Sequence, residues 1–581
     1  MGKNWKLGVL GILAAATVAT ATALPVSAGN GNPPDPNANS NGKGPHKMID
    51  VQILSFNDYH GYLEASTERL SAVQDPSQSM LGGSEYLSTK LNELRADAEH
   101  SLTVTAGDLI GGSPFLSGLF HDEPSVESLE AMGLDVSSVG NHEFDEGLTE
   151  LYRMQFGGCH PVDGCYFPDA PYDGASFPWL AANVTFTDTG ETVLPPTWTT
   201  EIDGVMIGFI GMTLEGTPEL VAARGIQGLS FNDEAESANA AARQLQQHNV
   251  DAIVVLLHEG GIQTGGVSEC VGMSGPIVDI ATHLDPSIDL VVTGHTHQPY
   301  VCNIPDPAGS PRMVTSASSF GRVVTETWIT IDKYTRDVVR PATTSTNHLV
   351  TQTTKDPALT TILQKWQVIS APIANRVVGT ITADITNPGN RQIETAMQNL
   401  VADGILAATE AEEDGGAEIA LINPGGVRAP LVFNQISGGE LPGEVTYGEA
   451  FSVQPFGNFL VSMDLTGAQV KAILEQQFFP RPPRLRLFLG ISDGLTYDWL
   501  QSQPQGSAVA NLRLNGELID PTRIYRVATN NFLADGGDGF TVFREGTNRV
   551  GGVDDLTALV QYLGSNSPVA PPSIDRVNEL P

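Results

Sequence analysis

Residues 49–61 read IDVQILSFNDYHG and decide the fold. The first eight are largely apolar without a polar residue at every second position, which is typical of a strand buried on both faces. Five similar runs follow in the first half of the chain: SLTVTA, VSSVG, GVMIGFIGM, DAIVVLLH and DLVVTGH. Amphipathic stretches such as 83–99 and 233–248 separate them, so residues 48–335 predict a layered α/β domain.

Polar residues gather where five of these runs end, often beside glycine. In extended backbone, residues two apart face the same side, so Asp58 and His60 can reach one metal ion. Ligands of an open α/β sheet bind just beyond the carboxyl ends of its strands. Turn chemistry would explain one such residue, but the ordered set predicts a metal site. The candidate ligands are Asp58, His60, Asp108, Asn141, His258, His295 and His297.

Mixed oxygen and imidazole donors suit Zn, Mn, Fe or Co better than Mg or Ca. The motifs resemble those of the calcineurin-like metallophosphoesterases, specifically the 5′-nucleotidase/UDP-sugar hydrolase branch. The resemblance implies a four-layer α/β sandwich with two divalent ions, of which Zn, Mn and Co are favoured. Some members have Gln where this chain has His297, so the metal stays open. The implied ligand sets are Asp58, His60 and His297 for one ion and Asn141, His258 and His295 for the other, with Asp108 bridging both.

A two-metal centre suggests the chemistry. Two cations bind a phosphate oxygen and lower the pKa of a water between them toward about 7, and the hydroxide then attacks phosphorus in line. His142 follows Asn141 directly, so we expect it beside the metals, stabilising the transition state or protonating the leaving oxygen. Asp145 is placed to hold the other ring nitrogen of His142, as the resemblance also implies. The alternative is that Asp145 caps the next helix.

A second, smaller α/β domain is expected over residues 377–581, after a linker (336–376) that holds a helix at 357–369. Its loops carry the motifs NPGGVR, QPFGN and NFLADGGDGF. Taken singly, each motif is explained by turns or core packing. Together they resemble the C-terminal signatures of the same family. The resemblance implies substrate binding by Arg391, Asn423, Arg428, Phe456, Asn458, Phe532 and Asp538, although the segment around Arg391 departs from the family pattern.

The side chains in these motifs suit a nucleotide. Phe456 and Phe532 offer two aromatic faces for a base, a contact worth roughly 1–3 kcal/mol. Asp538 can accept from both ribose hydroxyls. Arg428 and Arg391 can bind phosphate in a bidentate manner. They would offset the acidic character of a chain whose net charge is −37.

The first residues indicate export, in a bacterium to judge from the abundance of Ala. Lys3 and Lys6 precede an apolar stretch, and a small-x-small cleavage site ends at Ala28, so residues 1–28 predict a signal peptide. A transmembrane anchor is the alternative. Residues 29–47 are rich in Pro, Gly and Asn and predict a disordered spacer. The strong negative charge argues against nucleic-acid polymers and anionic membranes as partners, and nothing indicates stable membrane insertion.

Four cysteines in an exported chain favour disulfides over free thiols. They permit three pairings. Cys159–Cys165 and Cys270–Cys302 are favoured, because each pair lies within one loop-rich segment.

The predicted function is a secreted phosphohydrolase that releases phosphate from nucleotides, in the first place a 5′-nucleotidase. The motifs leave open a 2′,3′-cyclic-nucleotide phosphodiesterase with 3′-nucleotidase activity, or a UDP-sugar hydrolase. A non-catalytic binding protein would have lost a ligand or His142, and none is lost. Metals and base pocket lie on different domains, so we expect an open and a closed state. The oligomeric state stays open.

Overall fold

The computed structural model describes residues 47–65, 69–221, 223–389, 392–479 and 486–581. The expected signal peptide, the spacer up to residue 46 and Arg391 lie outside these ranges. Among the described residues, no helix combines the length and the apolar character needed to cross a membrane.

The first domain is built on two mixed sheets. One has the order β14-β13-β1-β2-β3-β4, with β15 also paired to β13. Strands β1 to β4 are parallel, and β13 is antiparallel to β1. Its strands are β1 (Met48–Phe56), β2 (Ser101–Ala106), β3 (Val136–Ser138), β4 (Trp179–Leu180), β13 (Val323–Asp332), β14 (Asp337–Val338) and β15 (Thr344–Leu349).

The second sheet has the order β11-β12-β10-β9-β7-β6, with β7, β9, β10 and β12 parallel. Its strands are β6 (Thr197–Ile202), β7 (Val205–Thr213), β9 (Ala252–His258), β10 (Leu290–Thr293), β11 (Pro299–Asn303) and β12 (Met313–Ala317). A separate pair is formed by β5 (Val184–Phe186) and β8 (Leu229–Phe231).

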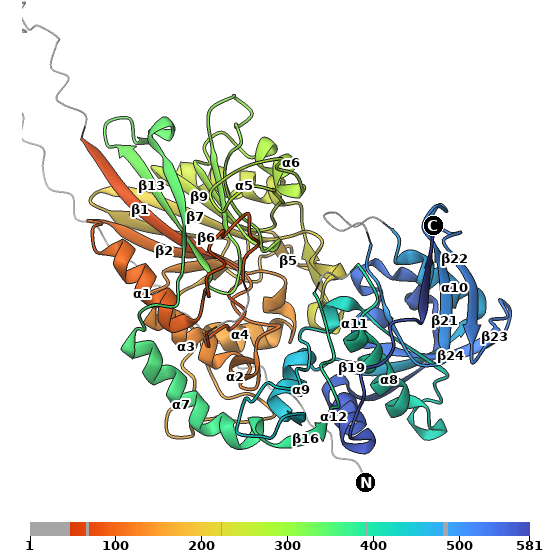
Figure 1. The fold of residues 1–581 in the computed structure, drawn as a ribbon. Helices are drawn as coiled ribbons and strands as arrows, with labels where there is room; N and C mark the ends of the chain where they lie inside the picture. Colours follow the sequence, from red (N-terminus) through yellow and green to blue (C-terminus); the bar gives the residue numbers. More distant parts are fainter. Residues whose placement is uncertain (1–46, 66–68, 222, 390–391, 480–485) are drawn as a thin grey trace, which may run out of the picture. The chain divides into compact units, whose positions relative to one another are not determined.

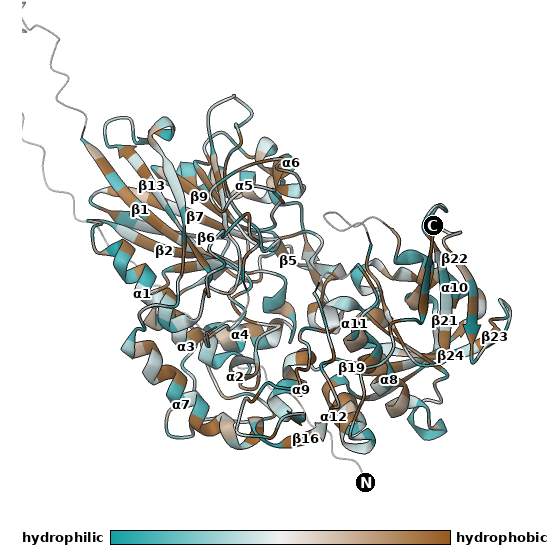
Figure 2. Ribbon diagram, in the orientation of Figure 1, coloured by the Kyte–Doolittle hydropathy of each residue, from teal (hydrophilic) through white to brown (hydrophobic). Residues whose placement is uncertain are grey.

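Both faces of the strands are buried, which explains their uninterrupted apolar runs. On β1, Ile53 packs in a core shared with β7, β9 and β10 of the second sheet, whereas Leu54 packs against helices. The hydropathy colouring shows this apolar character along the central strands (Figure 2). Helices on the outer faces complete the four layers. They are α1 (Ser84–Arg95), α3 (Glu123–Ala131) and α4 (Leu148–Phe156) on one side and α5 (Glu234–Gln247) and α6 (Pro276–His283) on the other.

The segment expected to be a linker belongs largely to the first domain. Strand β15 pairs with β13 over six residues, so the sheet continues past residue 335. The sequence did not indicate it, because TSTNHL is polar and only partly buried. Helix α7 (Pro357–Ala374) follows (Figure 1) and is longer than the expected helix at 357–369. On it, Trp366 donates a hydrogen bond to Glu127 of α3 at 2.7 Å.

The second domain contains a five-stranded sheet of order β20-β17-β24-β19-β25, a four-stranded sheet of order β23-β22-β21-β26 and a separate antiparallel pair, β16 and β18. The strands are β16 (Val377–Thr380), β17 (Ile419–Ile422), β18 (Glu444–Thr446), β19 (Phe459–Thr466), β20 (Gly490–Ile491), β21 (Leu495–Leu500), β22 (Val509–Leu514), β23 (Glu517–Leu518), β24 (Ile524–Asn530), β25 (Thr547–Asp554) and β26 (Val577–Leu580). The helices are α8 (Ala396–Thr409), α9 (Tyr447–Val453), α10 (Gly467–Gln476), α11 (Asn531–Ala534) and α12 (Asp555–Asn566).

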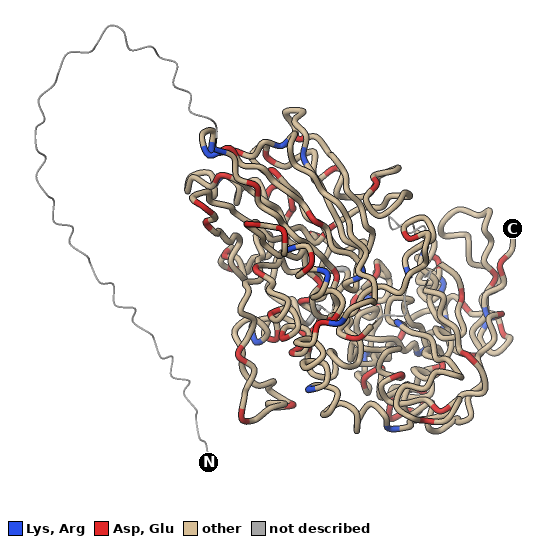
Figure 3. The backbone as a smooth tube through the Cα atoms, turned by 60° about the vertical axis from the view of Figure 1, so that its left-hand side comes forward, with Lys and Arg blue, Asp and Glu red and all other residues tan. Residues whose placement is uncertain are grey.

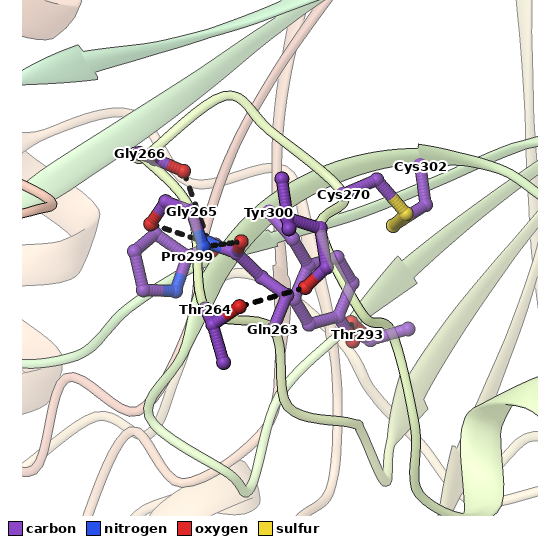
Figure 4. The surroundings of a disulfide bond; sticks show 10 residues. Gln263, Thr264, Gly265, Gly266, Cys270, Thr293, Pro299, Tyr300 and Cys302 are labelled. Carbon is purple, nitrogen blue, oxygen red and sulfur yellow. Dashed lines mark hydrogen bonds between the residues drawn. A yellow bond between two sulfur atoms is a disulfide. The ribbon is translucent and has the colours of Figure 1, made fainter.

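Both expected disulfides are present, Cys159–Cys165 and Cys270–Cys302. Figure 4 shows the second one, which joins the loop after β9 to β11. Gln263 reinforces the same junction, because its side-chain amide donates to the carbonyl oxygen of Pro299 at 3.0 Å. The backbone N–H of Val301 also donates to the carbonyl oxygen of Glu269 at 3.4 Å, so the loop is tied to β11 at three points.

Candidate active site

The carboxyl ends of β1, β2 and β10 turn sharply and bring polar side chains together. Asp58, His60 and Asp108 adopt positive φ angles of 50°, 47° and 51°, and His295 and His297 adopt 67° and 55°. Non-glycine residues rarely adopt this conformation, and such strain is concentrated at functional sites. Five of the seven predicted ligands are thus held by unusual backbone at strand ends.

One group consists of Asp58, His60 and His297, whose ligand atoms lie within 4.8 Å of one another. His60 donates from Nδ1 to the carbonyl oxygen of Gly111 at 2.7 Å, which leaves Nε2 as the nitrogen with a lone pair. That Nε2 atom is buried and has no hydrogen-bond partner. A buried polar atom without a partner is costly, so this nitrogen is suited to a cation.

A second group consists of Asp108, His258 and His295, again within 4.8 Å. His258 donates from Nδ1 to the carbonyl oxygen of Ala106 at 2.7 Å, so its Nε2 faces the carboxylate of Asp108 at 2.9 Å. Asn141 joins this group, because its Oδ1 lies 3.1 Å from Nδ1 of His295. The two groups meet at Asp108, whose Oδ2 is also 3.6 Å from Nε2 of His60.

The electrostatics of these groups favour bound cations. Burial lowers the pKa of both His60 and His295 to about 3, so their rings are neutral. Burial alone would raise the pKa of Asp108, but His258 and His142 hold it well below the usual range. His60 and His295 are thus neutral imidazoles beside ionised carboxylates, a donor set that suits metals such as zinc. The charge of Asp108 raises the pKa of His258 to about 10 against the effect of burial, so this ring would release a proton when an ion binds. The residues therefore fit a pair of divalent ions.

His142 and Asp145 form a dyad at the edge of the metal-ligand groups. The Nδ1 atom of His142 lies 2.7 Å from Oδ2 of Asp145. Helix α4 begins after Gly147 with no side-chain cap, so Asp145 does not cap it. The backbone N–H of His142 donates to Oδ1 of Asp108 at 2.9 Å, which links the dyad to this candidate metal ligand.

Two supporting residues were missed by the sequence reasoning. Glu143 accepts from the backbone N–H groups of Asp108 and Leu109 at 3.0 and 2.8 Å, and burial raises its pKa to about 7. Asn57 donates to Oδ2 of Asp58 at 2.5 Å. The sequence indicated them only by position, because Glu143 follows His142 and Asn57 precedes Asp58. Position 140 must be glycine, because a Cβ atom there would overlap the carboxylate of Asp108.

On the second domain, the three loop motifs converge. Asn423 donates to Oδ2 of Asp538 at 2.9 Å, which orients that carboxylate. The guanidinium of Arg428 lies over the ring of Phe456, 5.6 Å from its centroid. The Phe532 ring lies against Gly537, where a Cβ would be only 2.5 Å from it, so only glycine fits at this contact.

A single cavity of about 610 Å³ joins the two sets of residues. Across it, the His142 ring stacks on Phe456 with centroids 5.8 Å apart. Asp58 and His258 are fully buried behind the wall. The predicted residues that line the cavity are His60, Asp108, Asn141, His142, Asp145, His295, His297, Asn423, Arg428, Phe456, Asn458, Phe532 and Asp538.

The cavity also has walls that the sequence did not indicate. Apolar residues of the first domain line it, among them Leu214, Leu220 and Ile262, and Phe479 lines it from the second domain. Acidic residues outnumber basic ones along the chain (Figure 3), with totals of 67 acidic and 30 basic residues. The guanidinium of Arg428 is therefore important as local positive charge in the cavity.

Two sequence profiles match the chain. That of the calcineurin-like phosphoesterases covers residues 51–299, and that of the 5′-nucleotidase C-terminal domain covers residues 377–545. Among solved structures, a 5′-nucleotidase precursor from Thermus thermophilus superimposes with a TM-score of 0.72 at 26% identity, over 92% of this chain and 99% of that one.

Two curated relatives are about one third identical. Endonuclease YhcR of Bacillus subtilis is 32% identical over 530 residues, 90% of this chain and 40% of that protein. Cell wall protein Lmo0130 of Listeria monocytogenes is 33% identical over 546 residues, 89% of this chain and 67% of that protein. The chain thus spans less than half of the first relative and two thirds of the second.

Proposed function

We propose that this chain, which belongs to the calcineurin-like phosphoesterases that carry a 5′-nucleotidase C-terminal domain, is a secreted hydrolase that releases phosphate from nucleoside 5′-monophosphates. One observation carries the proposal. Residues of both metal-ligand groups and the aromatic and polar residues of the second domain line the same cavity. A molecule that occupies both ends has a phosphate at one end and an aromatic base at the other.

The metal ligands are proposed as Asp58, His60 and His297 for one ion and Asn141, His258 and His295 for the other, with Asp108 shared. Zn, Mn and Co are the candidates, because the donors are imidazole nitrogens together with carboxylate and amide oxygens. When bound, such ions polarise the phosphoryl group and lower the pKa of a water molecule.

The side chains of the chain have separate roles in the reaction. His142 lies at the cavity wall and holds a proton at Nε2, which it gives to the leaving ribose oxygen. Asp145 holds Nδ1–H and so keeps the ring in the orientation and charge state that this transfer needs. Arg428 contacts the phosphate from the second domain.

The nucleoside is held by the second domain. Phe456 and Phe532 stack on the base, and Asn458 contacts its edge. Asp538, oriented by Asn423, accepts from the ribose hydroxyls. Arg391 is retained from the family resemblance as a further phosphate contact. A closed state assembles these parts, and an open state releases the product.

Export is part of the proposal, with cleavage after Ala28 and the mature chain outside the cell. N-terminal sequencing of the protein recovered from culture medium tests this. A first residue other than Gly29 would contradict the cleavage site.

The enzymatic test is phosphate release by the purified mature protein with added Mn²⁺. The substrates are AMP, ATP, UDP-glucose, 2′,3′-cyclic AMP and single-stranded DNA. Release from AMP that His142→Ala reduces by about 10²–10⁴ supports the proposal. His283→Ala, which changes an exposed histidine that does not line the cavity, is the matched control. Preference for the cyclic nucleotide or UDP-glucose would favour those activities, and preference for DNA would favour a nuclease.

A further inference from the structure

A second group of imidazole and carboxylate side chains lies outside the two metal-ligand groups of the cavity. His121 lies between α2 (Phe115–Gly118) and α3. His160 and Asp163 lie in the loop closed by the Cys159–Cys165 disulfide. The ligand atoms of these three residues are within 4.8 Å of one another, and none of them lines the 610 Å³ cavity.

His121 is held in the way that histidine ligands of metals are held. Its Nδ1 atom lies 2.8 Å from a carboxylate oxygen of Glu146. Histidine ligands almost always donate their other ring N–H to a carboxylate or carbonyl, which fixes the ring and leaves the opposite nitrogen for the ion. That opposite nitrogen, Nε2, faces Asp163 at 2.8 Å. The side chain of His121 is only 19% exposed.

His160 is preorganised by the short covalent loop. The backbone N–H of His160 donates to the carbonyl oxygen of Gly164 at 3.1 Å, and the reverse bond is 2.9 Å. Its ring stacks on that of His121 with centroids 3.7 Å apart. Burial, assisted by the neighbouring His121, lowers the pKa of His160, so the ring is neutral. Its Nδ1 atom is the nitrogen with the lone pair, because it accepts a hydrogen bond from the backbone N–H of Asp163 at 3.1 Å.

The turn that carries His121 is also fixed. His121 and Asp122 both have positive φ angles, 48° and 61°. Asp122 accepts hydrogen bonds from the hydroxyl of Ser117 at 2.6 Å and from the backbone N–H of Gly111 at 2.8 Å. The carbonyl of Gly111 in turn accepts from His60. The group therefore adjoins a ligand of the catalytic centre without sharing a side chain with it.

We propose that His121, His160 and Asp163 form a third divalent-metal site, which takes Zn²⁺ in addition to the catalytic pair. Two ligand atoms at about 2.1 Å from a tetrahedral ion lie roughly 3.4 Å apart. The separations of Asp163 Oδ2 from His121 Nε2 and from His160 Nδ1, 2.8 and 3.6 Å, bracket that value. The ion takes the place of the proton between His121 and Asp163, which is released. It also displaces the backbone N–H of Asp163 from Nδ1 of His160, and a water molecule completes the coordination.

The competing explanation is an ion-pair network without metal. In that case His121 is an imidazolium between Glu146 and Asp163, whose hydrogen bonds and charges raise its pKa to about 9 against the effect of burial. The two explanations differ in one measurable quantity, the number of ions that the folded protein retains. The catalytic pair accounts for two ions, and the proposed site adds a third.

The test is a zinc count on the full mature chain. The protein is dialysed against Zn²⁺, free metal is removed, and zinc per chain is measured by mass spectrometry. We expect three ions in the wild type and in His283→Ala, whose exposed histidine lies beside Asp279 at the end of α6. We expect two in His121→Ala and two in His160→Gln.

A count of two in the wild type would overturn the third site while leaving the catalytic pair in place. Three ions in the wild type and three in the His121 and His160 variants would also overturn it, because the additional ion would then lie elsewhere. Asp163→Asn changes an exposed loop residue without changing its size. If His121→Ala does not fold, Asp163→Asn provides the same test, and we expect this variant to retain two ions.

Discussion

Removal of the Cys270–Cys302 disulfide tests how the cavity wall is held. The bond joins residues 32 apart, and the loop that it secures contributes Gly261, Ile262 and Gly275 to the cavity. A cross-link stabilises mainly by restricting the unfolded chain. For a separation of 32 the chain-entropy relation gives about 3.7 kcal/mol at 25 °C. For Cys159–Cys165, with a separation of 6, it gives about 2.2 kcal/mol.

The assay is urea unfolding of Cys270→Ala/Cys302→Ala and of the matched variant Cys159→Ala/Cys165→Ala. We expect the first to be the less stable of the two by about 1.5 kcal/mol. Below its transition it should still release phosphate, because Gln263 continues to tie the loop to Pro299. Equal destabilisation, or the reverse order, would refute the entropic reasoning. Loss of activity in the folded variant would show that Gln263 does not hold the loop.

Three further predictions concern the substrate, pH and metal. Phe532→Ala should raise KM for AMP by about 5- to 150-fold, which corresponds to 1–3 kcal/mol of stacking on the base. It should leave the hydrolysis of ribose 5-phosphate, which has no base, unchanged. An equal effect on both substrates would count against a stacking role. Burial raises the pKa of Asp555 to about 8, so the folded state retains a proton that the unfolded state loses. Asp555 should therefore make the stability fall by about 1.4 kcal/mol per pH unit between its unfolded pKa near 4 and about 8. The isosteric Asp555→Asn should lose this part of the pH dependence, as thermal unfolding of both proteins across pH would show. Dialysis against a chelator should abolish phosphate release, and addition of Mn²⁺ or Zn²⁺ should restore it. Activity that survives complete removal of metal would contradict the proposed metal centre.

Much of the first domain followed from the sequence. Long apolar runs indicate burial on both faces, and residues directly after such runs lie at one edge of a sheet, so the strand ends gave the candidate ligand positions. The resemblance to a known family then implied which residues share an ion. Polar strands escaped this reasoning, because β15 has no apolar run and is defined by its pairing with β13.

The sequence by itself determined the chemistry that is available: imidazoles and carboxylates at strand ends, and aromatic and amide side chains in three distant loops. Only the tertiary structure decided which of these meet. His142 and Phe456 are far apart in the chain and stack across one cavity, and Glu143 supports Asp108 through backbone hydrogen bonds that no pattern shows. Likewise, His121 joins His160 only because a disulfide loop folds against the turn before α3. Periodicity reports the burial of a segment, whereas contacts between remote segments are decided by how the layers and domains pack.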